Sequence, residues 1–261
     1  MVLSFDDLAS HFDDQRGLPV VALREWAAAV DLFAAGRTLE IVEPGIGTGR
    51  VTLPLAASGH RVTGVDVSGA MLQACAHKAE ALRVADRVTL LQGDATALPL
   101  PDHAFDLGVI ASLLYLVPDW TEVLDELHRV VTPGGSIAHL VERSESGDEL
   151  RLWDIAWRSR VESIGFRHAP LQPTPDEVQA EFRRRWPDTR IEILASWEFG
   201  QTIGEASDGY GERLRPLYAE IGDDEWDRIV GDFLHWAGNQ FPDPETRLGG
   251  QVVLEALISR T

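Results

Sequence analysis

Residues 37–141 alternate between short runs of β-branched residues and longer stretches with the apolar spacing of helices. This alternation is typical of a parallel sheet whose strands are joined by crossover helices. The pattern therefore predicts an α/β fold. The expected strands are residues 38–43, 61–66, 88–94, 105–111 and 135–141.

Local signals mark where the connecting helices begin and end. Gly59 is placed to end the first helix, and Ser68 to cap the second. Asp119 with Glu122 three residues later resembles a capping box ahead of the third. The segment Pro133-Gly134-Gly135 predicts a turn into the fifth strand.

The flanking segments are mostly helical, and no internal repeat or low-complexity linker separates them from the alternating unit. We therefore expect one domain, residues 1–261, with an N-terminal helical cap (1–36), a core (37–141) and a C-terminal helical region with the last two strands (142–261). The elements expected after the core are helices at 149–164, 174–185 and 204–238 and strands at 190–199 and 251–259.

Charge removes several function classes. The chain has 23 Lys and Arg against 42 Asp and Glu, a formal net charge of -19. So negative a surface repels phosphate backbones and anionic headgroups, so we expect no nucleic-acid partner and no membrane surface. Lys78 is the only lysine and has no glycine beside it, which excludes a P-loop and disfavours a Schiff-base mechanism.

Cysteine use and the N-terminus bear on the compartment. The single Cys75 excludes an internal disulfide, and without neighbouring ligands it forms no zinc site, so we expect it to pack and we expect no metal. The first residues are acidic where a signal peptide would be basic and apolar, and the longest apolar run is too short to cross a bilayer. These features predict a soluble, cytoplasmic protein.

Three acids stand at the carboxyl ends of predicted strands, where open parallel sheets bind their ligands. They are Glu43, Asp66 and Asp94. Glu43 also opens a glycine loop, residues 43–50, whose Gly45, Gly47 and Gly49 let the backbone approach a ligand closely. Asp66 follows the loop at the spacing of a ribose-binding carboxylate, so the pattern indicates an adenosine-type ligand.

Charge also selects among such ligands. A dinucleotide site places its third glycine where Arg50 stands, and Glu43 would repel a diphosphate there. S-adenosylmethionine has no phosphate and carries a sulfonium and an ammonium group. Its ribose hydroxyls suit Asp66, and its adenine amine can donate to Asp94, so the three acids match this cofactor.

Several segments then resemble a known family, the class I S-adenosylmethionine-dependent methyltransferases, in particular its small-molecule branch. The resemblance covers residues 37–141. The matching segments are Leu39-Glu40-Ile41-Val42-Glu43-Pro44-Gly45-Ile46-Gly47-Thr48-Gly49, Val65-Asp66-Val67-Ser68 with Met71, Gly93-Asp94-Ala95, Phe105-Asp106 with Leu116-Val117-Pro118-Asp119-Trp120, and Pro133-Gly134-Gly135.

The resemblance implies a Rossmann-like, doubly wound, mostly parallel seven-stranded sheet with an antiparallel last strand, and helical additions at both ends that form a lid. It implies S-adenosylmethionine as cofactor and a small-molecule methyl acceptor. The residues that it places at the cofactor are Glu43, Gly45, Gly47 and Gly49 at the methionine end, Asp66 and Val67 at the ribose, Met71, Asp94 and Ala95 at adenine, and Ala111 and Ser112 near the sulfonium. In the N-terminal cap, Arg16 would pair with the methionine carboxylate.

No catalytic residue is assigned from the sequence. His139, His168 and His235 are candidate bases, but single histidines are more often structural, and methyl transfer can proceed by alignment alone because the sulfonium is a good leaving group. Six of the eight tryptophans follow residue 150, which is typical of a helical core; a substrate chamber is the alternative.

Two rival functions stay open at this point. One is an NAD-dependent oxidoreductase, which Glu43 and Arg50 disfavour. The other is a catalytically silent cofactor-binding regulator. The acceptor atom (oxygen, nitrogen or carbon), the oligomeric state and the pathway do not follow from the sequence.

Overall fold

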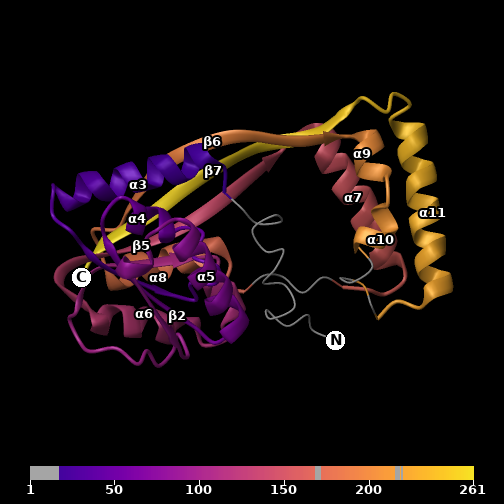
Figure 1. Cartoon of the computed structure of the whole chain (residues 1–261). Helices are drawn as coiled ribbons and strands as arrows, with labels where there is room; N and C mark the ends of the chain where they lie inside the picture. Colours follow the sequence, from indigo (N-terminus) through magenta and orange to yellow (C-terminus); the bar gives the residue numbers. More distant parts are fainter. Residues whose placement is uncertain (1–17, 168–171, 215–217, 219) are drawn as a thin grey trace. The chain divides into compact units, whose positions relative to one another are not determined.

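The computed structural model describes residues 18–167, 172–214, 218 and 220–261 (Figure 1). The chain divides into two compact units. We call residues 2–142, 171–195 and 254–261 the strand unit, and residues 143–170 and 196–253 the helical unit. The division of the chain into a single domain with cap, core and lid stays a prediction.

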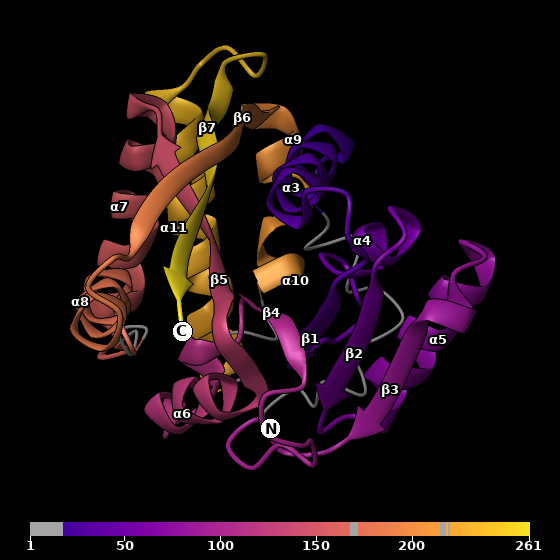
Figure 2. The same ribbon diagram turned by 90° about the vertical axis from the view of Figure 1, so that its left-hand side faces the viewer.

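Seven strands form one sheet in the order β3-β2-β1-β4-β5-β7-β6 (Figure 2). Strands β1 to β5 pair in parallel. The last strand runs antiparallel to β5, since Gly134 N–H donates to Thr261 O and Thr261 N–H donates to Gly135 O. The expected sheet is thus confirmed. The strands are β1 (Glu40–Pro44), β2 (Arg61–Asp66), β3 (Val88–Gln92), β4 (Phe105–Ala111), β5 (Val131–Ser146), β6 (Arg190–Thr202) and β7 (Arg247–Arg260).

The register of the parallel strands aligns their carboxyl ends. Glu43 of β1 lies beside Gly64 of β2, and Asp66 at the end of β2 lies beside Gln92 of β3. Strand β1 sits between β2 and β4. The connection after β1 runs to β2 on one side, and the connection after β3 crosses to β4 on the other side of β1. Such a switch point opens a crevice at the carboxyl edge, which is where the predicted acids end up.

The helices of the strand unit follow most of the local signals. Ser68 Oγ accepts from Met71 N–H at 3.1 Å and caps its helix, as predicted. Gly59, at φ +108°, follows the end of the first crossover helix. The capping box at Asp119 is wrong, because its side chain makes no cap hydrogen bond. These helices are α3 (Val20–Ala34), α4 (Leu53–Ala57), α5 (Gly69–Ala81), α6 (Trp120–Val130) and α8 (Pro175–Arg185).

Strand β5 is longer than the sequence predicts, beginning at Val131 and ending at Ser146. The segment Pro133-Gly134-Gly135 does not precede the strand as a turn. Phe105 pairs with Val131 but Leu107 pairs with Ser136, so the extra residues form a bulge within β5. A bulge keeps the strand in the sheet while the proline forms no ladder bond, which the local sequence signal for a turn does not distinguish.

One core cluster of the strand unit packs helices α6 and α8 against the sheet. It includes Leu124 and Leu127 of α6 and Phe182 of α8, all fully buried. Cys75 of α5 is also fully buried, which confirms the prediction that it packs.

Trp153, Trp157 and Trp226 are buried in the core of the helical unit, and Trp236 packs against that core. Trp153 and Trp157 of α7 meet Phe233 of α11 edge-on at ring-centre distances of 4.8 and 5.2 Å, and Trp157 also contacts Trp226. Such edge-to-face contacts stabilise a packed core. The helices of this unit lie together in Figure 1. They are α7 (Asp148–Ser163), α9 (Ile203–Ser207), α10 (Tyr210–Leu214) and α11 (Asp223–Gln240).

None of the described helices combines the length and the apolar composition needed to cross a bilayer.

His139 in β5 carries a polar atom that the core leaves without a partner. Its ring stacks on Phe182 at 5.7 Å, and its Nδ1 is buried with no hydrogen-bond partner among the described residues. Burial lowers the pKa of His139 from 6.5 to about 4. A buried unsatisfied group costs about 1–3 kcal/mol, so this histidine destabilises the fold.

We therefore expect His139→Leu to raise the free energy of unfolding by about 1–3 kcal/mol. The unfolded histidine takes up a proton near pH 6.5 while the folded one stays neutral to about pH 4, so wild-type stability falls as the pH falls through this window. The variant loses this acid sensitivity. Urea unfolding at pH 7.5 and pH 5 checks it, with exposed His77→Leu as control; equal acid sensitivity of variant and wild type would contradict it.

Candidate functional site

A pocket lies at the carboxyl ends of β1, β2, β3 and β4, wholly within the strand unit. We call it the strand-end pocket. Its lining residues are Glu43, Gly45, Ile46, Gly47, Arg50, Asp66, Val67, Met71, Gly93, Asp94, Ala95, Ala111, Ser112, Leu113, Leu116 and Val117. The structure thus brings together ten of the twelve predicted site residues, although they come from four separate strand ends.

Glu43 is the buried acid of this pocket, with 2% of its surface exposed. Thr52 donates its hydroxyl to Glu43 Oε2 at 2.6 Å. Burial nevertheless raises the pKa of Glu43 to about 8, against the lowering effects of Thr52 and Arg50. At neutral pH the carboxyl is therefore mostly protonated, and a cation beside it would favour its ionised form.

Asp66 joins the glycine loop to the second strand. Its Oδ2 accepts from Gly47 N–H at 2.8 Å and its Oδ1 accepts from Ser68 N–H at 2.9 Å. Two backbone donors hold the carboxylate in one orientation. Each oxygen keeps a second acceptor position, so the group can still receive a pair of hydroxyls.

Asp94 has one oxygen committed and one available. Its Oδ1 accepts from Thr96 N–H and from the Thr96 hydroxyl at 2.9 and 2.8 Å, and these bonds lower the pKa of Asp94. Among the described residues nothing hydrogen-bonds its Oδ2. Met71 nearby is almost fully buried yet lines the pocket, which gives the site an apolar wall.

The opposite wall is built from the loop after β4. Ser112 there has φ +54°, a left-handed conformation uncommon for a residue with a side chain. Its hydroxyl accepts from Arg50 Nη2 at 2.6 Å, while Arg50 Nη1 donates to Glu142 Oε1 at 3.1 Å. Arg50 therefore connects the glycine loop to the end of β4 and to β5.

The glycine loop needs its glycines for different reasons. Gly45, at φ +66°, passes so close to Leu113 that a Cβ would lie 2.6 Å from its Cδ1. Gly47, at φ +53°, has open space around it. Gly49 does not line the pocket; it lets the loop pass Leu53 and Cys75.

Gly49→Ala is expected to destabilise the protein by about 2–4 kcal/mol. A Cβ would lie 2.7 Å from both Cys75 Sγ and Leu53 Cγ, and φ is +73°, so overpacking adds to backbone strain. Gly59→Ala is the control, since φ is +108° but nothing lies within 4 Å, and about 1–2 kcal/mol is expected there. Urea denaturation measures both; an equal loss would mean that packing at Gly49 contributes nothing.

Arg16 and the N-terminal segment around it lie outside the described residues, so its predicted role stays a prediction. The sequence reasoning missed the apolar wall residues Ile46 and Leu113. It also treated Arg50 only as a departure from the dinucleotide fingerprint. The position of Arg50 at the end of the glycine loop was the available signal, but its partner Glu142 is 92 residues away in sequence.

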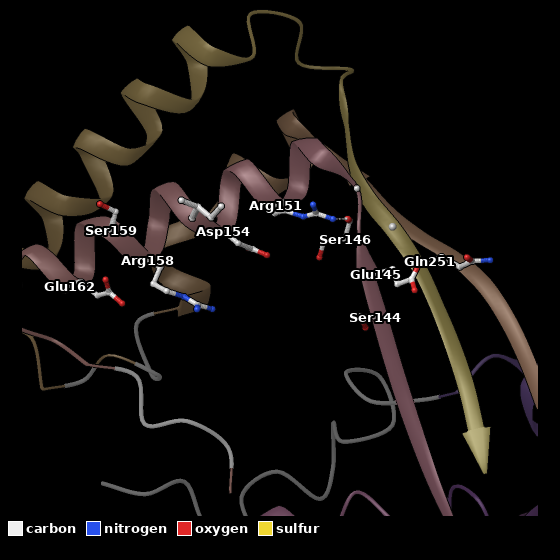
Figure 3. A pocket seen from close by; sticks show the side chains of 12 residues that line it. Ser144, Glu145, Ser146, Arg151, Asp154, Arg158, Ser159, Glu162 and Gln251 are labelled. Atoms are coloured by element: carbon white, nitrogen blue, oxygen red, sulfur yellow. Dashed lines mark hydrogen bonds between the residues drawn. The ribbon is translucent and has the colours of Figure 1, made fainter. Parts of the chain in front are cut away.

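A second, open cavity belongs to the helical unit. It lies between one side of α7 and the adjoining segments of β5 and β7, and Asp154 and Arg158 point from α7 to the same side (Figure 3). Burial raises the pKa of Asp154, and Arg158 opposes that shift. The side chains that line this cavity are mostly polar, and it contains none of the tryptophans.

In the part of the chain that the structure describes, no group of three or more His, Cys, Asp or Glu side chains is arranged to hold a metal ion.

Comparison with known proteins adds the family. A model described as a methyltransferase domain matches residues 42–139. A demethylmenaquinone methyltransferase of Clavibacter sepedonicus is 32% identical over 204 residues, which are 74% of this chain and 78% of the relative. One of Thermus thermophilus is 37% identical over 140 residues, which are 52% of this chain and 63% of the relative, so this match spans less than two thirds of that protein.

The fold comparison agrees. A SAM-dependent methyltransferase of Aquifex aeolicus has a TM-score of 0.52 at 18% identity, over 70% of this chain and 89% of that one. The segment matched by the family model runs from β1 into β5 and contains all three pocket acids. On the extent and identity of the Clavibacter match, the chain belongs to the class I S-adenosylmethionine-dependent methyltransferases.

Proposed function

We propose that the protein binds S-adenosylmethionine in the strand-end pocket and transfers its methyl group to a small molecule. The observation that carries this proposal is the convergence of Glu43, Asp66 and Asp94 on one pocket at the switch point of the sheet. The cofactor supplies an activated methyl group on a sulfonium that is a good leaving group. The protein then has to bind the cofactor and the acceptor, orient them and exclude water.

In this proposal each of the three acids binds a different part of the cofactor. Asp66, held by two backbone donors, offers its remaining acceptor positions to the two ribose hydroxyls. Asp94 offers Oδ2 to the adenine amine, and Met71 packs against the ring. Glu43 receives the ammonium at the methionine end and ionises in doing so, since a neighbouring cation favours the charged carboxylate.

Alignment is the main catalytic contribution in this proposal. Ala111 and Ser112 close the pocket after β4, and small side chains there leave room for an acceptor to approach along the line of the breaking bond. The buried His139 does not line the pocket, so we assign it no catalytic role.

The acceptor is proposed more coarsely. The family model ends at residue 139, before the helical unit begins, so we propose that this unit carries much of the acceptor specificity. Two relatives are named demethylmenaquinone methyltransferases, which makes demethylmenaquinone the first acceptor to assay.

Titration calorimetry with S-adenosylmethionine and with S-adenosylhomocysteine tests the proposal. Binding of both to the folded protein is expected; binding of neither would sink it. NAD is the control for the oxidoreductase alternative: stabilisation against heat by NAD and not by S-adenosylmethionine would favour that alternative. Methyl transfer to any acceptor would dismiss a catalytically silent protein.

A further inference from the structure

Arg50 is the one basic side chain among the described residues that line the strand-end pocket. Three acids line the same pocket, and the guanidinium acts electrostatically on the buried Glu43. Only 12% of the Arg50 side chain is exposed. A charge so well covered at the pocket wall is positioned to meet an anionic group of the ligand.

Two contacts of Arg50 within the strand unit are unequal. The bond from its Nη2 to Ser112 Oγ is short, at 2.6 Å, and lies within the pocket wall. The ion pair from Nη1 to Glu142 is longer, at 3.1 Å, and 37% of the Glu142 side chain is exposed. Partly exposed ion pairs are weak because solvent screens them, so the Glu142 contact is the weaker of these two and can be exchanged.

S-adenosylmethionine carries one anionic group, the carboxylate at its methionine end. In a pocket with three acids this carboxylate needs a cation, and a guanidinium binds carboxylates through two parallel hydrogen bonds. Resting on the proposed function, we propose that Arg50 binds the cofactor carboxylate and releases Glu142 when it does so. Ser112 keeps the guanidinium in place during the exchange.

This assignment differs from the prediction for Arg16, and the two can be separated. If Arg50 binds the carboxylate, its removal acts only on ligands that carry the carboxylate. The probes are S-adenosylhomocysteine, its decarboxylated analogue, and 5′-methylthioadenosine, which keeps adenine and ribose and lacks the amino acid.

Calorimetry with Arg50→Gln is the central measurement. We expect S-adenosylhomocysteine to bind roughly 10- to 100-fold more weakly, as for a lost charge-assisted hydrogen bond, and the two ligands without a carboxylate to stay within about twofold. Arg50→Lys should recover part of the loss, because lysine keeps the positive charge but lacks the paired N–H donors of the guanidinium. Arg61→Gln, an exposed arginine at the start of β2, controls for net charge and should change nothing.

The exchange makes a second prediction with the opposite sign. Glu142→Gln removes the competitor for Arg50, so S-adenosylhomocysteine should bind roughly two- to fivefold more tightly while 5′-methylthioadenosine does not change. Equal loss for all three ligands in Arg50→Gln would show a merely structural role and overturn the proposal. A loss confined to Arg16→Gln, or no gain in Glu142→Gln, would overturn it as well. If the wild-type protein binds none of these nucleosides, the proposed function fails instead.

Discussion

Asp66→Ala is expected to weaken binding of S-adenosylmethionine by roughly 10- to 150-fold, or about 1.5–3 kcal/mol. The carboxylate is the proposed acceptor for both ribose hydroxyls. It also orders the loop through Gly47 N–H, so its removal costs ligand contacts and loop position together. Titration calorimetry measures the change in dissociation constant.

Asp106→Ala is the matched control for this variant. Asp106 accepts from Glu40 N–H at 2.9 Å, so it too is a carboxylate bound to backbone in the strand unit. It stands near the start of β4, away from the lining of the pocket. Equal weakening by both variants would mean that Asp66 acts through stability, and unchanged binding in Asp66→Ala would remove the ribose assignment.

Glu43→Gln is expected to make the protein more stable at alkaline pH and a poorer cofactor binder. Burial raises the pKa of Glu43 from 4.5 to about 8. Between these values the folded state holds a proton that the unfolded chain has lost, so wild-type stability falls as pH rises, by about 1.4 kcal/mol per unit. Glutamine cannot ionise and can still accept from the Thr52 hydroxyl, so the variant loses this slope.

Urea unfolding at pH 5, 7 and 9 measures the slope for Glu43→Gln, with Glu40→Gln as the control because Glu40 is on the same strand with its side chain 46% exposed. A slope unchanged in Glu43→Gln would show that this carboxyl does not titrate in the window.

Cofactor binding should release the proton that Glu43 carries at neutral pH. If the ammonium of the cofactor ionises Glu43, close to one proton leaves per cofactor bound at pH 7. Calorimetry in two buffers with different ionisation enthalpies measures the number released. The release should vanish in Glu43→Gln, and wild-type binding without proton release would contradict the proposed contact with the ammonium.

Asp66 and Glu43 also show how much of the site could be predicted from the sequence. Both follow short β-branched runs, and a parallel sheet places such ends at one edge, so their meeting in one pocket followed from the order of the elements. The protonation state of Glu43 could not be predicted from the sequence. Its neutral form at pH 7 depends on burial to 2%, which arises from side chains packed around it from several elements.

Local signals succeeded where the interaction is local. The predicted cap at Ser68 forms, and its hydroxyl binds Met71 N–H three residues later. The signal at Asp119 failed at the same spacing. The identities of Asp119 and Glu122 alone do not determine the backbone dihedrals and the side-chain contacts of that turn.

The order of apolar runs, the glycine loop and the spacing of the acids were enough to predict the parallel sheet and the edge where a ligand would bind, because both depend on periodicity and on chain direction. Long-range packing set the rest: the protonated Glu43, the bulge in β5 and the pairing of Arg50 with Glu142. Each of these depends on residues distant in the chain, whose distances and burial exist only once the sheet and helices have packed.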